Sequence, residues 1–537
     1  MAVPVTPDML DPKTPDDVIV QAEAREPVSD PTLGIAVNVN RQGTPKHRLV
    51  TIGDSLSHGF QSGAIFNTKL SYPMLIAREM GWEKNLRYPS YGGPGDGLPL
   101  NLERVSRQLE QQYGDNIDWW DFAPGLIFLR KYLDAVEDYW ERGEGSNFPT
   151  KGLINHNLGV YGWDLRNTLS RTADDCLAVL NRNKSKDDFL RQVAENHNER
   201  AALRVLNTAR DSQGKALTPL QAAAALGAEG TQETNDGDGI ETLIILIGSN
   251  NALGSILTFK VIWSAEGYDD MGRNDRYTVW RPIHFKAELD NLVAEVKKIK
   301  ARHVIWGTVP HVTIAPFARG VELKVRPGSR YFPFYTLPWI NDDDFHPNKH
   351  PNLKEQEVRA IDSAIDQYNE YITDAVRQGR NEGRDWYVYE TAGLLDRFAS
   401  RRYIKDPTAR PNWWTEYPLP TELKALLPVP DSRFFTSDST GRKTGGLFSL
   451  DGIHPTTIGY GIMAQEFIKI MQLAGVKFYQ ADGKTERTGE IKVNFNRLIA
   501  WDTLISKPPH SISNDLSLIG FIDKNFNLFN QLLKGSY

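Results

Sequence analysis

Five short runs of β-branched and aromatic residues, each closed by turn residues, constrain the fold of this chain more than any other feature. Most are nearly continuously apolar, which is typical of strands buried on both faces of a parallel sheet. Helical patterns lie between them, over 72–81, 288–301 and 356–376. The runs are HRLVTIGD (47–54), GLINHNLGV (152–160), TLIILIG (242–248), HVIWGTV (303–309) and WYVYETA (386–392).

Alternation of strands and helices predicts an α/β fold, a three-layer α/β/α sandwich around a five-stranded parallel sheet. The pattern over 356–376 places one apolar stripe on its helix: Val358, Ile361, Ile365, Tyr368 and Ile372. In such folds the functional sites lie at the carboxyl ends of the strands. Turns that follow the five runs are therefore where chemistry is expected.

The strands are far apart in the sequence, so one domain over 47–475 carries large insertions, at 60–150, 184–238, 312–355 and 400–445. Residues 1–46 are rich in Pro and Asp without periodicity, and we expect an extended or disordered lead-in. Residues 476–537 form a C-terminal extension that is expected to pack on the domain. Its segment 516–535 predicts an amphipathic helix, and its few basic residues favour docking over peripheral contact with lipid.

Composition excludes several classes of function. A net charge of −6 argues against nucleic acid as the main partner, because phosphate binding needs a clustered positive surface. Cys176 is the single cysteine, so neither an internal disulfide nor a cysteine-rich metal site is expected. No apolar run has the length of a membrane span, and the N-terminus lacks the pattern of a secretory signal. The compartment and the oligomeric state stay open.

Ser55 follows the first predicted strand in the sequence RLVTIGDSLSHG. A serine that opens a helix after a buried parallel strand presents its hydroxyl at the functional rim. The alternative is that Ser55 or Asp54 only caps the helix, since both residue types are good caps. The G-x-S-x-G nucleophile elbow fits poorly, because Ser57 occupies the position of its second glycine.

Three further motifs carry groups that acyl transfer needs. Asp451 and His454 lie three residues apart in SLDGIHP, where Asp451 could orient His454 as the base for Ser55. Asn250 follows the third strand and could donate its amide to an oxyanion, as could the backbone N–H of Gly162 after the second strand. Taken singly, these residues are also ordinary caps and turn residues.

Together, the motifs resemble the SGNH hydrolases, also called GDSL esterases and lipases. The matching blocks are GDSL (53–56), NLGVYG (157–162), GSNN (248–251) and DGIH (451–454), in the order of that family. The resemblance implies Ser55 as nucleophile, His454 as base, Asp451 as its orienter and an oxyanion hole from Ser55 N–H, Gly162 N–H and Asn250. It also implies the flavodoxin-like sheet order 2-1-3-4-5. The third block departs from the G-x-N-D pattern of the family, because Asn251 replaces the acid, and Gly93 is an alternative to Gly162.

The predicted function is a serine esterase or lipase that hydrolyses a small-molecule or lipid ester and needs no cofactor or metal. An acyltransferase with an alcohol acceptor would use the same triad, and a non-catalytic binding module could retain the fold. The aromatic residues of the first insertion either belong to the core or roof the site as an acyl pocket or lid. They are Trp119, Trp120, Phe122, Phe128, Tyr139 and Trp140.

Two polar segments have the composition of a metal site. The stretch NDDDFHPNKH (341–350) holds three aspartates and two histidines, but its prolines and lack of helical pattern favour a solvated loop. The stretch NDGDG (235–239) lacks the glutamate that closes a calcium loop, which favours a turn. No metal ligands are therefore predicted.

Overall fold

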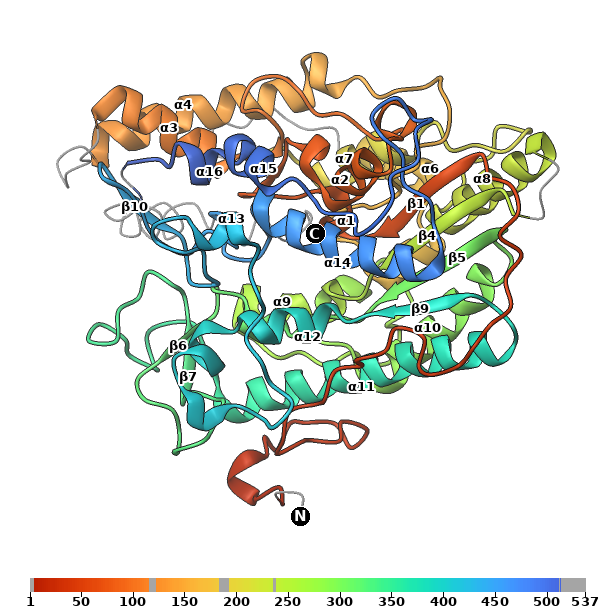
Figure 1. Ribbon diagram of the computed structural model, residues 1–537. Helices are drawn as coiled ribbons and strands as arrows, with labels where there is room; N and C mark the ends of the chain where they lie inside the picture. Colours follow the sequence, from red (N-terminus) through yellow and green to blue (C-terminus); the bar gives the residue numbers. More distant parts are fainter. Residues whose placement is uncertain (1–3, 115–121, 183–192, 235–237, 511, 513–537) are drawn as a thin grey trace.

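The computed structural model describes residues 4–114, 122–182, 193–234, 238–510 and 512 (Figure 1). At its centre is a parallel sheet of four strands in the order β1-β4-β5-β9. The strands are β1 His47–Gly53, β4 Ile240–Leu246, β5 Ala301–Gly307 and β9 Trp386–Tyr389. The α/β class and the parallel sheet are as predicted from the continuously apolar runs.

The prediction of five strands in the order 2-1-3-4-5 is wrong, because the run 152–160 forms no strand. This segment lies beside β1, but only Thr51 and Asn157 form a bridge. The N–H groups of His156 and Asn157 donate to the carbonyl oxygen of Arg87, away from the sheet. The side-chain amide of Asn157 donates to the carbonyl oxygen of Ser57 at 2.7 Å. Backbone hydrogen bonds from Thr51 to His156, from Leu158 to Thr51 and from Val160 to Gly53 still link the segment to β1, so it is an edge segment with a single bridge and not a strand.

Helices cover both faces of the sheet (Figure 1). One face packs against α2 Tyr72–Glu79 and α14 Thr457–Ala474, and the other against α10 Pro282–Val296 and α11 Glu355–Asn381. Neighbouring residues of β1 alternate between these two cores: Leu49 belongs to the first, Val50 and Ile52 to the second. The predicted stripe on α11 is buried along its whole length. This layering explains why the strands are apolar throughout.

The insertions contribute most of the remaining elements, which surround the sheet. The helices are α1 Ser55–His58, α3 Leu102–Tyr113, α4 Phe122–Glu141, α5 Leu165–Ser170, α6 Ala173–Arg182, α7 His197–Leu206, α8 Pro219–Thr234, α9 Asn250–Thr258, α12 Thr391–Phe398 and α13 Thr421–Lys424. Two short antiparallel pairs are β2 Ala64–Ile65 with β3 Leu98–Pro99 and β10 Thr436–Asp438 with β11 Gly441–Thr444. A three-stranded antiparallel sheet has β7 Phe334–Thr336 between β6 Arg319–Val321 and β8 Asn352–Lys354.

Both ends of the described chain lie against the α/β core. The lead-in runs extended along α11 and the outer edge of β9, where the N–H of Val388 donates to the carbonyl oxygen of Pro31 at 3.0 Å (Figure 1). At the other end, α15 Phe495–Trp501 packs on α14 and is followed by α16 Thr503–Ser506. The helix predicted over 516–535 lies outside the described residues. Among the described helices, none has the length and apolarity needed to span a membrane.

Candidate active site

Ser55 lies at the carboxyl end of β1 as the first residue of the short helix α1. The turn before it requires glycine, because a Cβ on Gly53 would lie 2.4 Å from the carbonyl oxygen of Leu246. Asp54 caps α1, with its side chain accepting the N–H of Leu56 at 3.0 Å. Asp54 therefore caps the helix and Ser55 lies next to it at the edge of the sheet, so the hydroxyl of Ser55 is not used for capping.

His454 and Asp451 reach Ser55 from a loop that precedes α14. Ser55 Oγ lies 2.8 Å from His454 Nε2, and His454 Nδ1 lies 3.0 Å from Asp451 Oδ2. All three residues are buried, with Ser55 6% exposed. This is the geometry of a nucleophile, a base and an orienting carboxylate. Three residues from two distant parts of the sequence thus form one hydrogen-bonded chain.

The Asp451 carboxylate is held by backbone donors as well as by His454. Oδ1 accepts the N–H groups of Ile453 and His454 at 2.9 and 2.8 Å, and Oδ2 accepts the N–H of Gly63 at 3.0 Å. Burial would raise the pKa of Asp451, but the charge of His454 and these hydrogen bonds outweigh it and lower the pKa. Asp451 is thus suited to remain ionised next to the imidazole.

A segment that sequence reasoning missed supports this loop from the start of the first insertion. The N–H of Ser62 donates to Ser449 Oγ at 2.8 Å, and Ser62 Oγ accepts the N–H of Leu450 at 3.3 Å. The ring of Phe60 packs on the His454 imidazole with 4.5 Å between centroids. No sequence motif marks these residues, because their role depends on a contact across almost 400 positions.

Gly162 and Asn250 come together next to the carboxyl end of the sheet. The Asn250 side-chain amide donates one hydrogen to the carbonyl oxygen of Trp163 at 2.7 Å, and its second amide hydrogen has no acceptor among the described residues. Gly162 has φ +77°, a conformation that favours glycine, and a Cβ there would lie 3.0 Å from Asn198 Nδ2. Gly93, the alternative donor, lies instead against the ring of Tyr139.

Backbone donors near the site are free within the described part of the chain. The N–H groups of Ser55 and Gly162 have no protein acceptor there, whereas the N–H groups of Asp54 and Val160 donate to Leu246 and Gly53. An N–H group without a partner at the carboxyl end of a sheet can donate to a negatively charged oxygen. Ser55, Gly162 and Asn250 therefore each retain one hydrogen for such an oxygen.

An apolar pocket opens beside Ser55 and His454. Its walls come from the turn after β5, from α12, from α14 and from the loop before α14. The lining includes Leu253, Val312, Leu394, Phe398, Leu447, Phe448, Ile453, Ile462 and Met463. Of the aromatic block in the first insertion, the described side chains of Phe128, Tyr139 and Trp140 do not line this pocket, and Trp140 is fully buried in a separate cluster with Tyr91 and Tyr161. Trp119 and Trp120 and the side chain of Phe122 lie outside the described part of the chain.

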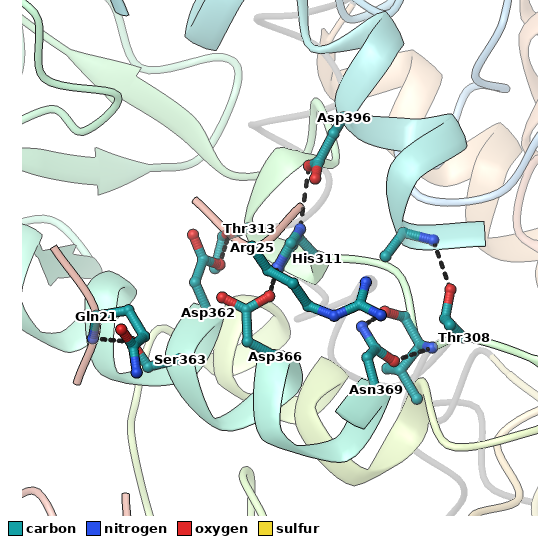
Figure 2. A network of polar contacts seen from close by, with 12 residues as sticks. Gln21, Arg25, Thr308, His311, Thr313, Asp362, Ser363, Asp366, Asn369 and Asp396 are labelled. Carbon is teal, nitrogen blue, oxygen red and sulfur yellow. Dashed lines mark hydrogen bonds and ion pairs between the residues drawn. The ribbon is translucent and has the colours of Figure 1, made fainter. Parts of the chain in front are cut away.

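A buried polar network fixes two walls of this pocket (Figure 2). His311, just after β5, lies between Asp366 of α11 and Asp396 of α12. Its Nε2 is 3.0 Å from Asp366 Oδ1, and its Nδ1 is 3.0 Å from Asp396 Oδ1. Burial opposes the imidazolium, but the two carboxylates outweigh it and raise the pKa of His311 well above its usual value. The sequence offers no signal for this network, since its members lie 55 and 85 positions apart.

The two segments with metal-like composition show other contacts. Asp342 forms an ion pair with Arg319, and the N–H of His346 donates to His350 Nδ1 at 3.0 Å. In the segment 235–239, residues 235–237 lie outside the described residues. Within the described residues, no three His, Cys, Asp or Glu side chains are grouped in a way that could hold a metal ion.

Comparison of this chain with models of protein families, with curated proteins and with solved structures found no match.

Proposed function

We propose that the chain is a serine hydrolase that cleaves a carboxylic ester through an acyl-enzyme. The observation that carries the proposal is the hydrogen-bonded chain from Ser55 Oγ to His454 to Asp451 at the wall of an apolar pocket. The four motifs that resemble the SGNH hydrolases are consistent with the same roles. No metal or cofactor is part of the proposal.

In the proposed mechanism, Ser55 Oγ attacks the ester carbonyl while His454 Nε2 takes its proton. Asp451 holds the other ring nitrogen and stabilises the imidazolium that forms. The tetrahedral oxyanion would accept hydrogen bonds from Ser55 N–H, Gly162 N–H and the second amide hydrogen of Asn250. His454 then protonates the leaving alcohol, and a water molecule resolves the acyl-enzyme by the same route.

The composition of the pocket favours an apolar acyl group larger than acetyl. Nearly all side chains that line it are aliphatic or aromatic, apart from Ser55, His454, Ser249 and Thr391. Each methylene that enters such a pocket contributes about 0.8 kcal/mol, which is about fourfold in kcat/KM. We therefore expect kcat/KM to rise from acetate to medium-length acyl chains.

The first test is hydrolysis of p-nitrophenyl esters from acetate to long acyl chains. Ser55→Ala should lower kcat/KM about a thousandfold or more, to near background, because the nucleophile is lost. Ser57→Ala is the matched control: this serine lies in the same helix, but its hydroxyl bonds to Tyr72 at 2.7 Å and not to His454. It should retain most of the activity.

A second readout identifies the nucleophile without a substrate. An organophosphonate that phosphonylates activated serines should label Ser55 in the wild type and leave Ser55→Ala unlabelled, as measured by mass spectrometry of the digest. Activity that survives in Ser55→Ala, or label on another serine, would contradict the proposal. Adding a short alcohol to the ester assay and analysing the products separates hydrolysis from transfer to an alcohol acceptor.

A further inference from the structure

A second pocket, separate from Ser55, is lined by six basic side chains. They are Arg319, Arg330, Arg401, Arg402, Lys405 and Arg433. None of the described residues that line it is acidic; the others are apolar residues, a glycine, a tyrosine and five serine or threonine side chains. Such a concentration of one charge is unusual in a protein whose net charge is −6.

Three of these six cations are neutralised from outside the pocket. Arg402 pairs with Asp362 at 2.9 Å, Arg433 pairs with Asp431 at 2.6 Å, and Arg319 pairs with Asp342. Arg330, Arg401 and Lys405 have no carboxylate within ion-pair distance among the described residues. Three positive charges are therefore left to face the pocket.

Arg330 is the least expected of the three, because it is 8% exposed. Its Nε is buried without a hydrogen-bond partner, and no hydrogen bond from its other nitrogens is present among the described residues. The guanidinium lies 4.9 Å from the centroid of the Tyr331 ring, and the charge of nearby Asp362 favours the cation. Its terminal nitrogens make no hydrogen bond among the described residues and are therefore available to an anion in the pocket.

The neighbouring groups match an oxyanion with several oxygens. Ser400 is 7% exposed and lines the same pocket, and its hydroxyl makes no hydrogen bond in the described part of the chain. Arg401 and Lys405 lie near enough to other cations that burial and this repulsion lower the pKa of both. A carboxylate would neutralise one charge, whereas a phosphate group carries nearly two negative charges and three acceptor oxygens.

We infer that this pocket binds a phosphate group, either inorganic phosphate or the phosphate of an organic monoester, between Arg330, Arg401 and Lys405. Arg330 supplies the buried bidentate donor that suits phosphate oxygens, and Lys405 supplies a charge at the exposed rim. This inference does not depend on the proposed function, because neither Ser55 nor His454 lines the pocket.

The site also touches the walls of the candidate active site. Ala315 lines both pockets, and Phe398 of the apolar pocket is followed directly by Ala399 of the basic one. Phe434, in the basic pocket, packs so closely on Gly452 that a Cβ there would lie 2.7 Å from its ring. Gly452 lies between Asp451 and His454, so a bound phosphate adjoins the loop that holds them.

The test is isothermal titration calorimetry of the full chain with inorganic phosphate and, separately, with glycerol 3-phosphate at low ionic strength. We expect saturable binding that weakens about tenfold or more in Arg330→Gln, because a charge-assisted pair of hydrogen bonds is lost. Lys405→Gln, at an exposed position that tolerates change, should weaken binding several-fold. Arg377→Gln, an exposed arginine on α11, is the matched control and should leave binding unchanged.

The two ligands distinguish the source of the phosphate: equal affinities point to inorganic phosphate, and tighter binding of glycerol 3-phosphate points to an organic monoester. Absence of saturable binding by either ligand would overturn the inference. The inference would also be overturned if both single variants, Arg330→Gln and Lys405→Gln, bound phosphate as tightly as the wild type while circular dichroism showed them to be folded. Binding in Ser55→Ala should equal that of the wild type, which keeps this test independent of ester hydrolysis.

Discussion

The carboxyl group of Asp54 is fully buried beside Ser55, so a titratable group lies directly under the candidate nucleophile. Burial raises its pKa to about 6, and the hydrogen bond from Leu56 opposes this only in part. A carboxyl whose pKa is higher in the folded state keeps its proton there after the unfolded chain has lost it. Stability then falls as pH rises from the unfolded pKa toward the folded one and is constant above it.

For Asp54 the window runs from about pH 4 to about pH 6, and the loss over it is about 3 kcal/mol. Asp54→Asn keeps an oxygen for the N–H of Leu56 but cannot ionise. We therefore expect its free energy of unfolding to fall less than that of the wild type between these pH values, as measured by urea denaturation. The exposed Asp344→Asn should follow the wild type. Parallel profiles for Asp54→Asn and the wild type would contradict the assignment.

At the scale of elements, His311 joins the turn after β5 to α11 and α12 (Figure 2). Because its pKa is raised in the folded state, its stabilisation is complete below the unfolded pKa of about 6.5. The stabilisation is lost as pH rises through the higher folded pKa. The charge of one imidazolium thus helps to hold two walls of the apolar pocket together.

His311→Gln removes this charge and leaves Asp366 and Asp396 facing an uncharged side chain in the interior. Breaking a buried pair in this way typically costs about 3–5 kcal/mol. We expect the loss in free energy of unfolding to be largest below about pH 6.5 and to shrink at alkaline pH. Urea denaturation across this range measures it, with the exposed His346→Gln as control. A loss that does not change with pH would show that the charge of His311 is not what stabilises the network.

Elements that are continuously apolar were predictable from the sequence, and those held by polar contacts were not. The strands β1, β4, β5 and β9 and the long helix α11 lie where their patterns indicate. The run 152–160 shares three backbone hydrogen bonds with β1, but the N–H groups of His156 and Asn157 donate to Arg87 and only a single bridge forms. The spacing of apolar residues indicates which segments are buried, but it does not indicate which hydrogen-bond partner a backbone group has.

For the candidate site the same distinction applies at the level of side chains. Ser55, Asp451 and His454 were identified from turn motifs after strands, and the structure brings them within hydrogen-bond distance. Gly63 and Ser62, which hold the Asp451 loop, carry no motif, since any residue can donate a backbone N–H. The aromatic residues of the first insertion were left as either core or a roof of the site, and the residues that line the apolar pocket instead include aliphatic side chains of α12, α14 and the turn after β5.

At the scale of the whole molecule, the C-terminal extension completes the core on one face of the sheet. Leu498 of α15 is 2% exposed and packs on α14, where a Cβ on Gly461 would lie 2.3 Å from its Cδ1. Leu498→Ala should lower the free energy of unfolding by about 2–5 kcal/mol, because it leaves a cavity between α14 and α15. Leu473→Ala, on α14 but 52% exposed, is the control for urea denaturation and should change it little.

If the extension were only an appendage, Leu498→Ala would unfold at the same urea concentration as the wild type. A single shifted transition would instead indicate that α15 unfolds together with the sheet. A separate, earlier transition would indicate that the extension unfolds as a unit of its own.

The hydrogen bond between Ser55 and His454 joins positions 399 residues apart. A ribosome that adds about 5–20 residues per second needs roughly 20–80 s to travel between them. During that interval the nascent chain carries the serine without its partner histidine, and the loop that holds Asp451 does not yet exist. The hydrogen bond between Ser55 and His454 can therefore form only after position 454 has been translated, and any product of premature termination before that position is released without it.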